Sequence, residues 1–293
     1  MFYQKIIVLF ALFCFNLSIV NAAVNEVIPG DYEAPAVGIN LATLYLAERK
    51  MAGPYVEGHK LTDETVTSLI TAVKFTATVD IGGYTVCPMV ALPYSVTKSN
   101  GDTISAMLGH ESVGFSDVLV GATGWLINDK AKNQYLAATL LLFAPTGEYN
   151  PQQLLNIGEN RYKSTLNIGY IQKLSDDFLI ELSPELALYG TNDNSLGRTI
   201  EQDPSYALTT TIRYNQTPKL TLFSGFQQNY GGETIVDGVA QNDTSRMQKA
   251  TLGGYYYTLA GTQIFLRYAK EFQTQSGMRT SDDFLVRFQW WFR

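Results

Sequence analysis

The stretch FLVRFQWWF, residues 284–292, decides the fold class, because its aromatic and apolar residues recur at every second position. One face of the implied strand carries Phe284, Val286, Phe288, Trp290 and Phe292. The other face carries the cation Arg287. A soluble sheet could bury the first face, but a membrane β-barrel would turn it to lipid and turn the second face to water. We expect this strand to close such a barrel, and its apolar face to act as the signal that the barrel-assembly machinery reads.

Residues 1–22 predict a cleaved secretory signal peptide. Lys5 precedes an apolar run, residues 6–15, and Ala22 ends a small-residue site of the kind that signal peptidase cleaves. An uncleaved anchor helix is the alternative, but Asn16 interrupts a run already shorter than the ~20 apolar residues that span a bilayer. Since no later apolar stretch is long enough for a transmembrane helix, a membrane location would require strands.

About twelve later segments of roughly 10–14 residues alternate with period two and predict β-strands. They span residues 37–48, 65–81, 83–96, 115–127, 134–145, 161–173, 178–190, 204–214, 219–230, 247–258, 262–273 and 282–292. The connections alternate between long and short, as the extracellular loops and periplasmic turns of outer-membrane barrels do, whereas a soluble sandwich has no reason to alternate. We expect an all-β protein: an antiparallel up-and-down barrel over residues 37–293, preceded by a periplasmic segment, residues 23–36.

Charged residues recur on one face of the predicted strands, and that face should point inward. An Arg or Lys that faced lipid at mid-membrane would cost about 2–4 kcal/mol. The charged residues that we expect to line the lumen are Lys74, Lys163, Glu181, Glu185, Arg213, Lys249, Arg267, Glu271 and Arg287. They could form a hydrated transport path, or they could pair with one another and fill a narrow interior.

Composition argues against nucleic acid, cofactors and catalysis. The net charge is −6, and no basic cluster is present that would bind a phosphate backbone. The two histidines, His59 and His110, fall in predicted outer loops without the setting of a nucleophilic hydrolase, so we expect no catalytic residue. Glu111 and other loop acids could bind a divalent ion, but we interpret them as solvated charge and expect no metal site. Cys87 is the only cysteine after the signal, which leaves no disulfide.

Several spaced stretches resemble one family of outer-membrane barrels. They are residues 115–125, 144–149, 156–161, 201–204, 231–234 and 237–238. In this order they resemble the family labelled as putative proteins of the MetA, or meta-cleavage, pathway of phenol degradation. The resemblance implies an outer-membrane barrel with a role in the passage of aromatic or other hydrophobic compounds, and it does not imply an enzyme of that pathway.

We therefore expect an integral outer-membrane channel for passive passage of small hydrophobic or aromatic solutes. The alternative is a barrel that transports nothing and whose loops form an adhesin-like surface, and a third hypothesis is a lipolytic enzyme. The expected partners are outer-membrane lipid, lipopolysaccharide, the barrel-assembly machinery and small solutes. Nucleic acid is not among them.

Overall fold

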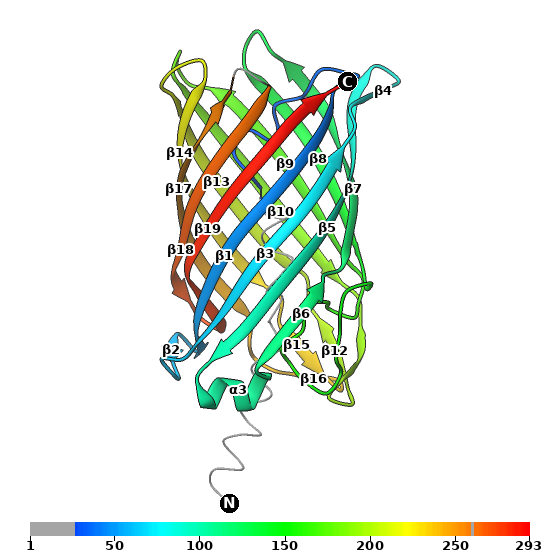
Figure 1. Cartoon of the computed structure of the whole chain (residues 1–293), viewed down its shortest axis with the longest axis vertical. Coiled ribbons are helices and arrows are strands. Elements are labelled where there is room, and N and C mark those ends of the chain that lie inside the picture. The colour runs from blue at the N-terminus through cyan, green and yellow to red at the C-terminus, as the bar shows by residue number, and fades with distance from the viewer. Residues whose placement is uncertain (1–26, 259–260) are drawn as a thin grey trace, which may run out of the picture.

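Twelve long strands form a closed antiparallel barrel in the computed structural model, which describes residues 27–258 and 261–293 (Figure 1). The strands are β1 (Asn40–Val56), β3 (Thr65–Thr76), β5 (Tyr84–Asn100), β7 (Val118–Asp129), β8 (Gln134–Ala144), β9 (Lys163–Lys173), β10 (Phe178–Tyr189), β13 (Ser205–Asn215), β14 (Leu220–Gly231), β17 (Ser245–Tyr257), β18 (Thr262–Thr274) and β19 (Gly277–Phe292). Each of them pairs with the next, and β19 pairs with β1, so the predicted barrel is confirmed. The predicted signal peptide lies outside the described residues.

Along each strand, alternate residues face opposite sides of the barrel wall, with exposed apolar residues outside and charged residues inside. In β19, Phe284 is 54% exposed, whereas Leu285 and Arg287 are each 1% exposed. In β13, Tyr206 faces outward and Arg213 is buried in the interior. An apolar exterior around a polar interior is the arrangement that a lipid-embedded barrel requires. In the part of the chain that the structure describes, no helix has the length and apolarity to cross a membrane.

Some strands are longer than the alternation predicts. β1 continues beyond residue 48 to Val56, and β5 continues beyond residue 96 to Asn100. Residues 94–98 of β5, where this extension begins, pair with a further strand, β6 (Glu111–Phe115), most of which falls where the sequence predicts a loop. The hydrogen bonds of a strand pair do not require an apolar face, so pairing can continue where the alternation that marks the lipid-facing wall has ended.

The long connections form a folded layer at the end of the barrel opposite the C-terminus (Figure 1). It contains β2 (His59–Lys60), the helix α3 (Asp102–Leu108) and a small sheet of β11 (Asn192–Ser195), β12 (Arg198–Gln202), β15 (Thr234–Val236) and β16 (Val239–Ala240). A buried apolar cluster joins α3 and the β8–β9 loop to the inner wall: Met51, Val66, Ile104, Leu108, Leu155 and Ile157. At the other end the connections are short, and β4 (Val79–Ile81) pairs with β5 in a tight hairpin.

Part of the chain before β1 lies inside the barrel, near the end of the short turns, whereas residues 36–38 are exposed. We call residues 27–39 the N-terminal segment. Ile28 and Tyr32 in it are buried, and its backbone and side chains contact residues of the inner wall. For the described part of the segment expected to be periplasmic, residues 23–36, the structure shows docking against the inner wall at this end, and its periplasmic location stays a prediction. Charge accounts for this docking, because Asp31 and Glu33 form ion pairs with arginines of the barrel interior.

Candidate functional site in the barrel lumen

The charged residues predicted to face the lumen all lie on the inner side of the wall. Glu181, Arg213, Lys249, Arg267, Glu271 and Arg287 are buried, and Lys74, Lys163 and Glu185 are partly buried. The structure does not place them in one row. It distributes them over separate clusters at different heights, and several pair with residues that the sequence did not single out. Their part in transport stays a prediction.

One cluster surrounds Arg213 on β13. Its guanidinium contacts the carboxylate of Glu181 on β10 and lies 2.6 Å from the carboxylate of Glu33 in the N-terminal segment. The same guanidinium donates a hydrogen bond of 2.6 Å to the hydroxyl of Tyr255. Glu181 also accepts a hydrogen bond from the backbone N–H of Gly30, at 3.1 Å. The cluster therefore joins the N-terminal segment to two strands of the wall.

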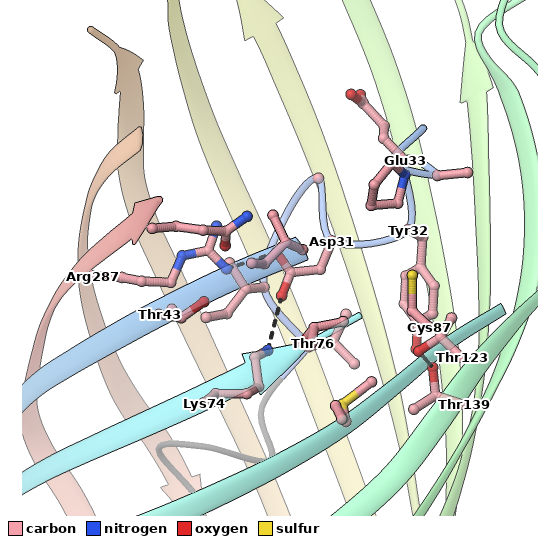
Figure 2. A pocket seen from close by; sticks show the side chains of 18 of the residues that line it. Asp31, Tyr32, Glu33, Thr43, Lys74, Thr76, Cys87, Thr123, Thr139 and Arg287 are labelled. Atoms are coloured by element: carbon pink, nitrogen blue, oxygen red, sulfur yellow. Dashed lines mark hydrogen bonds and ion pairs between the residues drawn. The ribbon is translucent and has the colours of Figure 1, made fainter. Parts of the chain in front are cut away.

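A second cluster surrounds Asp31, also in the N-terminal segment (Figure 2). The Asp31 carboxylate lies 2.6 Å from the guanidinium of Arg287 on β19 and 4.0 Å from the ammonium of Lys74 on β3. Arg287 also donates a hydrogen bond of 2.5 Å to the side-chain oxygen of Gln263. The carboxylate therefore pairs closely with Arg287 and lies at the outer limit of an ion pair with Lys74.

Tyr32, which lies between Asp31 and Glu33 in the sequence, contacts the inner wall through both its backbone carbonyl and its ring. The indole N–H of Trp125 on β7 donates a hydrogen bond of 2.8 Å to the backbone carbonyl of Tyr32. The Tyr32 ring packs over Gly169 on β9, where a Cβ atom would overlap the ring. Sequence reasoning missed this docked segment. Its signal was the run Asp31–Tyr32–Glu33, which places two acids around an aromatic residue directly before a wall that supplies interior arginines.

A third cluster lies in the part of the lumen nearer the folded loops. Asp283 on β19, which is fully buried, lies 2.5 Å from Arg49 on β1 and 2.9 Å from Arg267 on β18. Nearby, the carboxylate of Glu271 accepts a hydrogen bond of 2.7 Å from the hydroxyl of Thr280. Neither Arg49 nor Asp283 was among the predicted lumen residues. Arg49 falls just beyond the predicted end of its strand, whereas Asp283 lies within the predicted strand 282–292, on the face of Arg287, where alternation alone could have found it.

The fourth cluster lies where β9 and β10 approach the loop layer. Glu159 lies 2.9 Å from Arg161 and 3.6 Å from Lys163. Both cations also lie over the ring of Tyr189, at 4.7 Å and 5.6 Å from its centre. A cation over an aromatic face is stabilised by the ring quadrupole, so this part of the lumen combines charge with aromatic surface.

A cavity of about 310 Å³ lies between the N-terminal segment and the inner wall (Figure 2). Asp31, Tyr32, Lys74 and Arg287 contribute polar groups to its lining. Apolar side chains from neighbouring strands complete the wall: Met89, Leu119, Trp125 and Leu141. The cavity therefore offers an apolar surface and ionised groups to the same solute.

The other residues considered from the sequence lie apart from the lumen or are otherwise engaged. His59, in β2, and His110, just before β6, are exposed, and Glu111 forms an ion pair of 3.0 Å with Lys98. Among the described residues, no group of three or more His, Cys, Asp or Glu side chains could hold a metal ion. Cys87 is buried, with its sulfur 3.4 Å from the hydroxyl of Thr78.

The closed wall, the apolar exterior suited to lipid and the charged interior define the class of protein: an outer-membrane β-barrel of the kind that forms channels. The chain belongs to the family described as "Putative MetA-pathway of phenol degradation", whose family model matches residues 52–286. The predicted resemblance is thereby confirmed.

Comparison with solved structures supports the same class. The chain is similar to the COG4313 outer membrane channel from Pseudomonas putida F1, at 30% identity and a TM-score of 0.86, over 91% of this chain and 100% of that chain. It also shares its fold with the beta domain of the Bordetella autotransporter BrkA, at 12% identity and a TM-score of 0.52, over 88% of this chain and 100% of that one. No curated protein matches the chain.

Proposed function

We propose that the protein is a passive outer-membrane channel for small hydrophobic or aromatic solutes. The observation that carries this proposal is the cavity beside the N-terminal segment, where Met89, Leu119 and Leu141 line the lumen together with ionised groups. Sites for small organic molecules combine apolar walls with a few placed polar groups, and this cavity has that composition.

The proposed path runs from the folded loops to the short turns. A solute would first meet Arg161, Lys163 and Tyr189, and would then reach the cavity next to Lys74. The N-terminal segment borders the rest of the path, so a solute must pass beside it or displace it. The driving force in this proposal is the concentration gradient of the solute.

Flux through purified protein in liposomes tests the proposal. We expect proteoliposomes to pass benzyl alcohol and benzoate faster than a disaccharide, and faster than protein-free liposomes pass them. Folding is checked in the same sample by the heat-dependent shift in electrophoretic mobility that intact barrels show. A folded barrel that passes none of the three solutes would overturn the proposal.

A second candidate function is a closed barrel that presents its loops as an interaction surface. The observation that favours it is the occupation of both ends, by the N-terminal segment at one end and by α3, the β8–β9 loop and the small sheet at the other. This candidate predicts no flux and no ion conductance, either in the unmodified protein or after the N-terminal segment is detached. The third hypothesis, a lipolytic enzyme, makes a different prediction: the purified protein would hydrolyse esters, and His59→Ala or His110→Ala would abolish that activity.

We also propose that the signal peptide is removed near residue 22, and that the outward face of β19 is read during barrel assembly. Phe284, Trp290 and Phe292 on that face are exposed along the last strand, as a recognition signal requires. Mass spectrometry of the protein isolated from outer membranes tests the first point. For the second, we expect Phe292→Ser to reduce the amount of assembled barrel, while the matched change Phe226→Ser on the outward face of β14 has a smaller effect.

A further inference from the structure

We propose that the cavity beside Lys74 binds a small monocarboxylate with an apolar body about the size of one ring. The inference rests on the proposed function, because it names the chemical class of the solute. It goes beyond that function by assigning a binding site to particular residues, with the carboxylate at Lys74 and Thr43 and the ring against the apolar wall.

The first step in the argument is that the acids around the cavity are already used by other cations. Asp31 lies 2.6 Å from Arg287, and Glu33 lies 2.6 Å from Arg213. Lys74 is 4.0 Å from Asp31, which is too long for a good charge-assisted hydrogen bond. Lys74 lines the cavity, and its ammonium also lies 5.4 Å from the centre of the Tyr45 ring. A carboxylate entering the cavity could approach this ammonium to about 2.7–2.9 Å, the usual distance for such a bond.

The second step concerns two polar atoms that lack a hydrogen-bond partner among the described residues. They are the hydroxyl oxygen of Thr43 and the side-chain oxygen of Asn167, in residues that are 3% and 2% exposed. Both residues line the cavity. Thr43 on β1 is the register partner of Lys74 on β3. Since buried polar groups are nearly always hydrogen-bonded, unpartnered atoms in a cavity indicate a polar ligand. Of these two, only the Thr43 hydroxyl can donate a hydrogen bond to a carboxylate, because the Asn167 oxygen is an acceptor.

The third step concerns the size and the apolar part of the ligand. A volume of about 310 Å³ lies at the lower end of the range for small-molecule pockets, roughly 300–1,000 Å³. Met89, Leu119 and Leu141 supply its apolar wall. An inorganic anion would leave this wall uncovered, and a second negative charge on the ligand would add to the repulsion from Asp31, which lies 4.0 Å from Lys74. The combination therefore favours one negative charge on an apolar body.

Binding of three matched probes to the purified full-length barrel tests this inference. Benzoate, benzyl alcohol and benzylamine share a ring and differ in carrying a carboxylate, a hydroxyl or an ammonium group. By isothermal titration calorimetry we expect benzoate to bind about tenfold more tightly than benzyl alcohol, and benzylamine to bind more weakly than either. Equal affinity for benzoate and benzyl alcohol would overturn the assignment.

Substitutions then locate the site. Lys74→Met should reduce the affinity for benzoate about tenfold and leave that for benzyl alcohol unchanged. Thr43→Val, which is nearly isosteric and should preserve the barrel, should lower the affinity for benzoate alone. The control is Lys132→Met, which removes a lysine from an exposed turn where it pairs with Asp129. If both interior variants fold and bind benzoate as tightly as the unmodified protein does, the inference is wrong.

Flux measurements keep this inference distinct from the proposed function. Binding of benzoate that depends on Lys74, in a protein that passes no solute, would support the site and overturn the channel. Passage of benzyl alcohol and benzoate at equal rates, without preferential binding of benzoate, would support the channel and overturn the site.

Discussion

The carboxylate of Glu33 in the N-terminal segment lies 2.6 Å from the guanidinium of Arg213, a β13 residue whose side chain is 1% exposed. Asp31, two residues earlier, makes the equivalent contact with Arg287 on β19. Three strands, β14, β17 and β18, separate these two arginines around the barrel. The segment is therefore attached at two well-separated points, and it neutralises two of the cations that would otherwise face a passing solute.

The paired change Asp31→Asn and Glu33→Gln should detach the N-terminal segment and raise single-channel conductance. Each substitution removes the charge of one ion pair to a buried arginine, at a cost of about 1–3 kcal/mol. Conductance in a planar bilayer measures the result. Asp129→Asn and Asp176→Asn, which change carboxylates paired with lysines in exposed turns, are the matched control and should have no effect. Unchanged conductance in the paired variant would mean that the segment does not limit the path.

Gly169→Ala should destabilise the docked segment, because the added Cβ would overlap the ring of Tyr32. Overpacking of this kind costs about 1–3 kcal/mol. The melting temperature of the barrel and the labelling rate of a cysteine placed at Ala34, a buried residue of the segment, report the change. In the double variant with Tyr32→Ala, the glycine substitution should cost almost nothing further, since the two residues are in contact. Additive effects would contradict this packing.

Asp283→Asn should destabilise the barrel by about 3–5 kcal/mol, because it leaves the buried cations Arg49 and Arg267 without their shared carboxylate. Unfolding in urea, followed by the heat-dependent mobility shift, measures the loss. The neighbouring change Asp282→Asn supplies the control: Asp282 accepts a hydrogen bond from the hydroxyl of Tyr268 on the outer side of the wall and should matter much less. Similar losses for both variants would show that the buried cluster is not the source.

The start of α3 should lose protection in acid. The Glu64 carboxylate accepts hydrogen bonds from the backbone N–H groups of Ile104 at 2.5 Å and Thr103 at 3.2 Å, and the bond from Ile104 lowers the pKa of Glu64. Because the pKa of Glu64 is lowered in the folded protein, this stabilisation is complete when the pH is above the ordinary pKa of a glutamate. It disappears as the pH falls through the lowered pKa. Protection of these two amides from hydrogen exchange should therefore fall below about pH 4.

Glu64→Gln should remove most of that pH dependence. Asp63→Asn is the control, because the pKa of Asp63 is also lowered but its carboxylate pairs with Lys60 and not with α3. Loss of the pH dependence in the Asp63 variant, or its persistence in the Glu64 variant, would contradict the assignment.

Much of the barrel wall could be predicted from the alternation of residue types along the sequence, whereas many of the contacts inside the lumen could not. The inward side of β13 and β19 was predictable because Arg213 and Arg287 each alternate with outward aromatic or apolar neighbours. Their partners in the N-terminal segment, Glu33 and Asp31, were not predictable. These acids lie 180 or more residues earlier, in a segment with no alternation of its own. Cluster membership was likewise hidden: Arg49 and Asp283 are register partners only because the last strand meets the first.

Local sequence therefore specified the strands, their facing and the membrane-barrel class, because side chains alternate with period two and lipid excludes charge from one face. Closure of the barrel, docking of the N-terminal segment and formation of the cavity beside Lys74 were decided only in three dimensions. Each depends on the register between strands far apart in the chain, and on ion pairs that exist only once that register brings their charges within bonding distance.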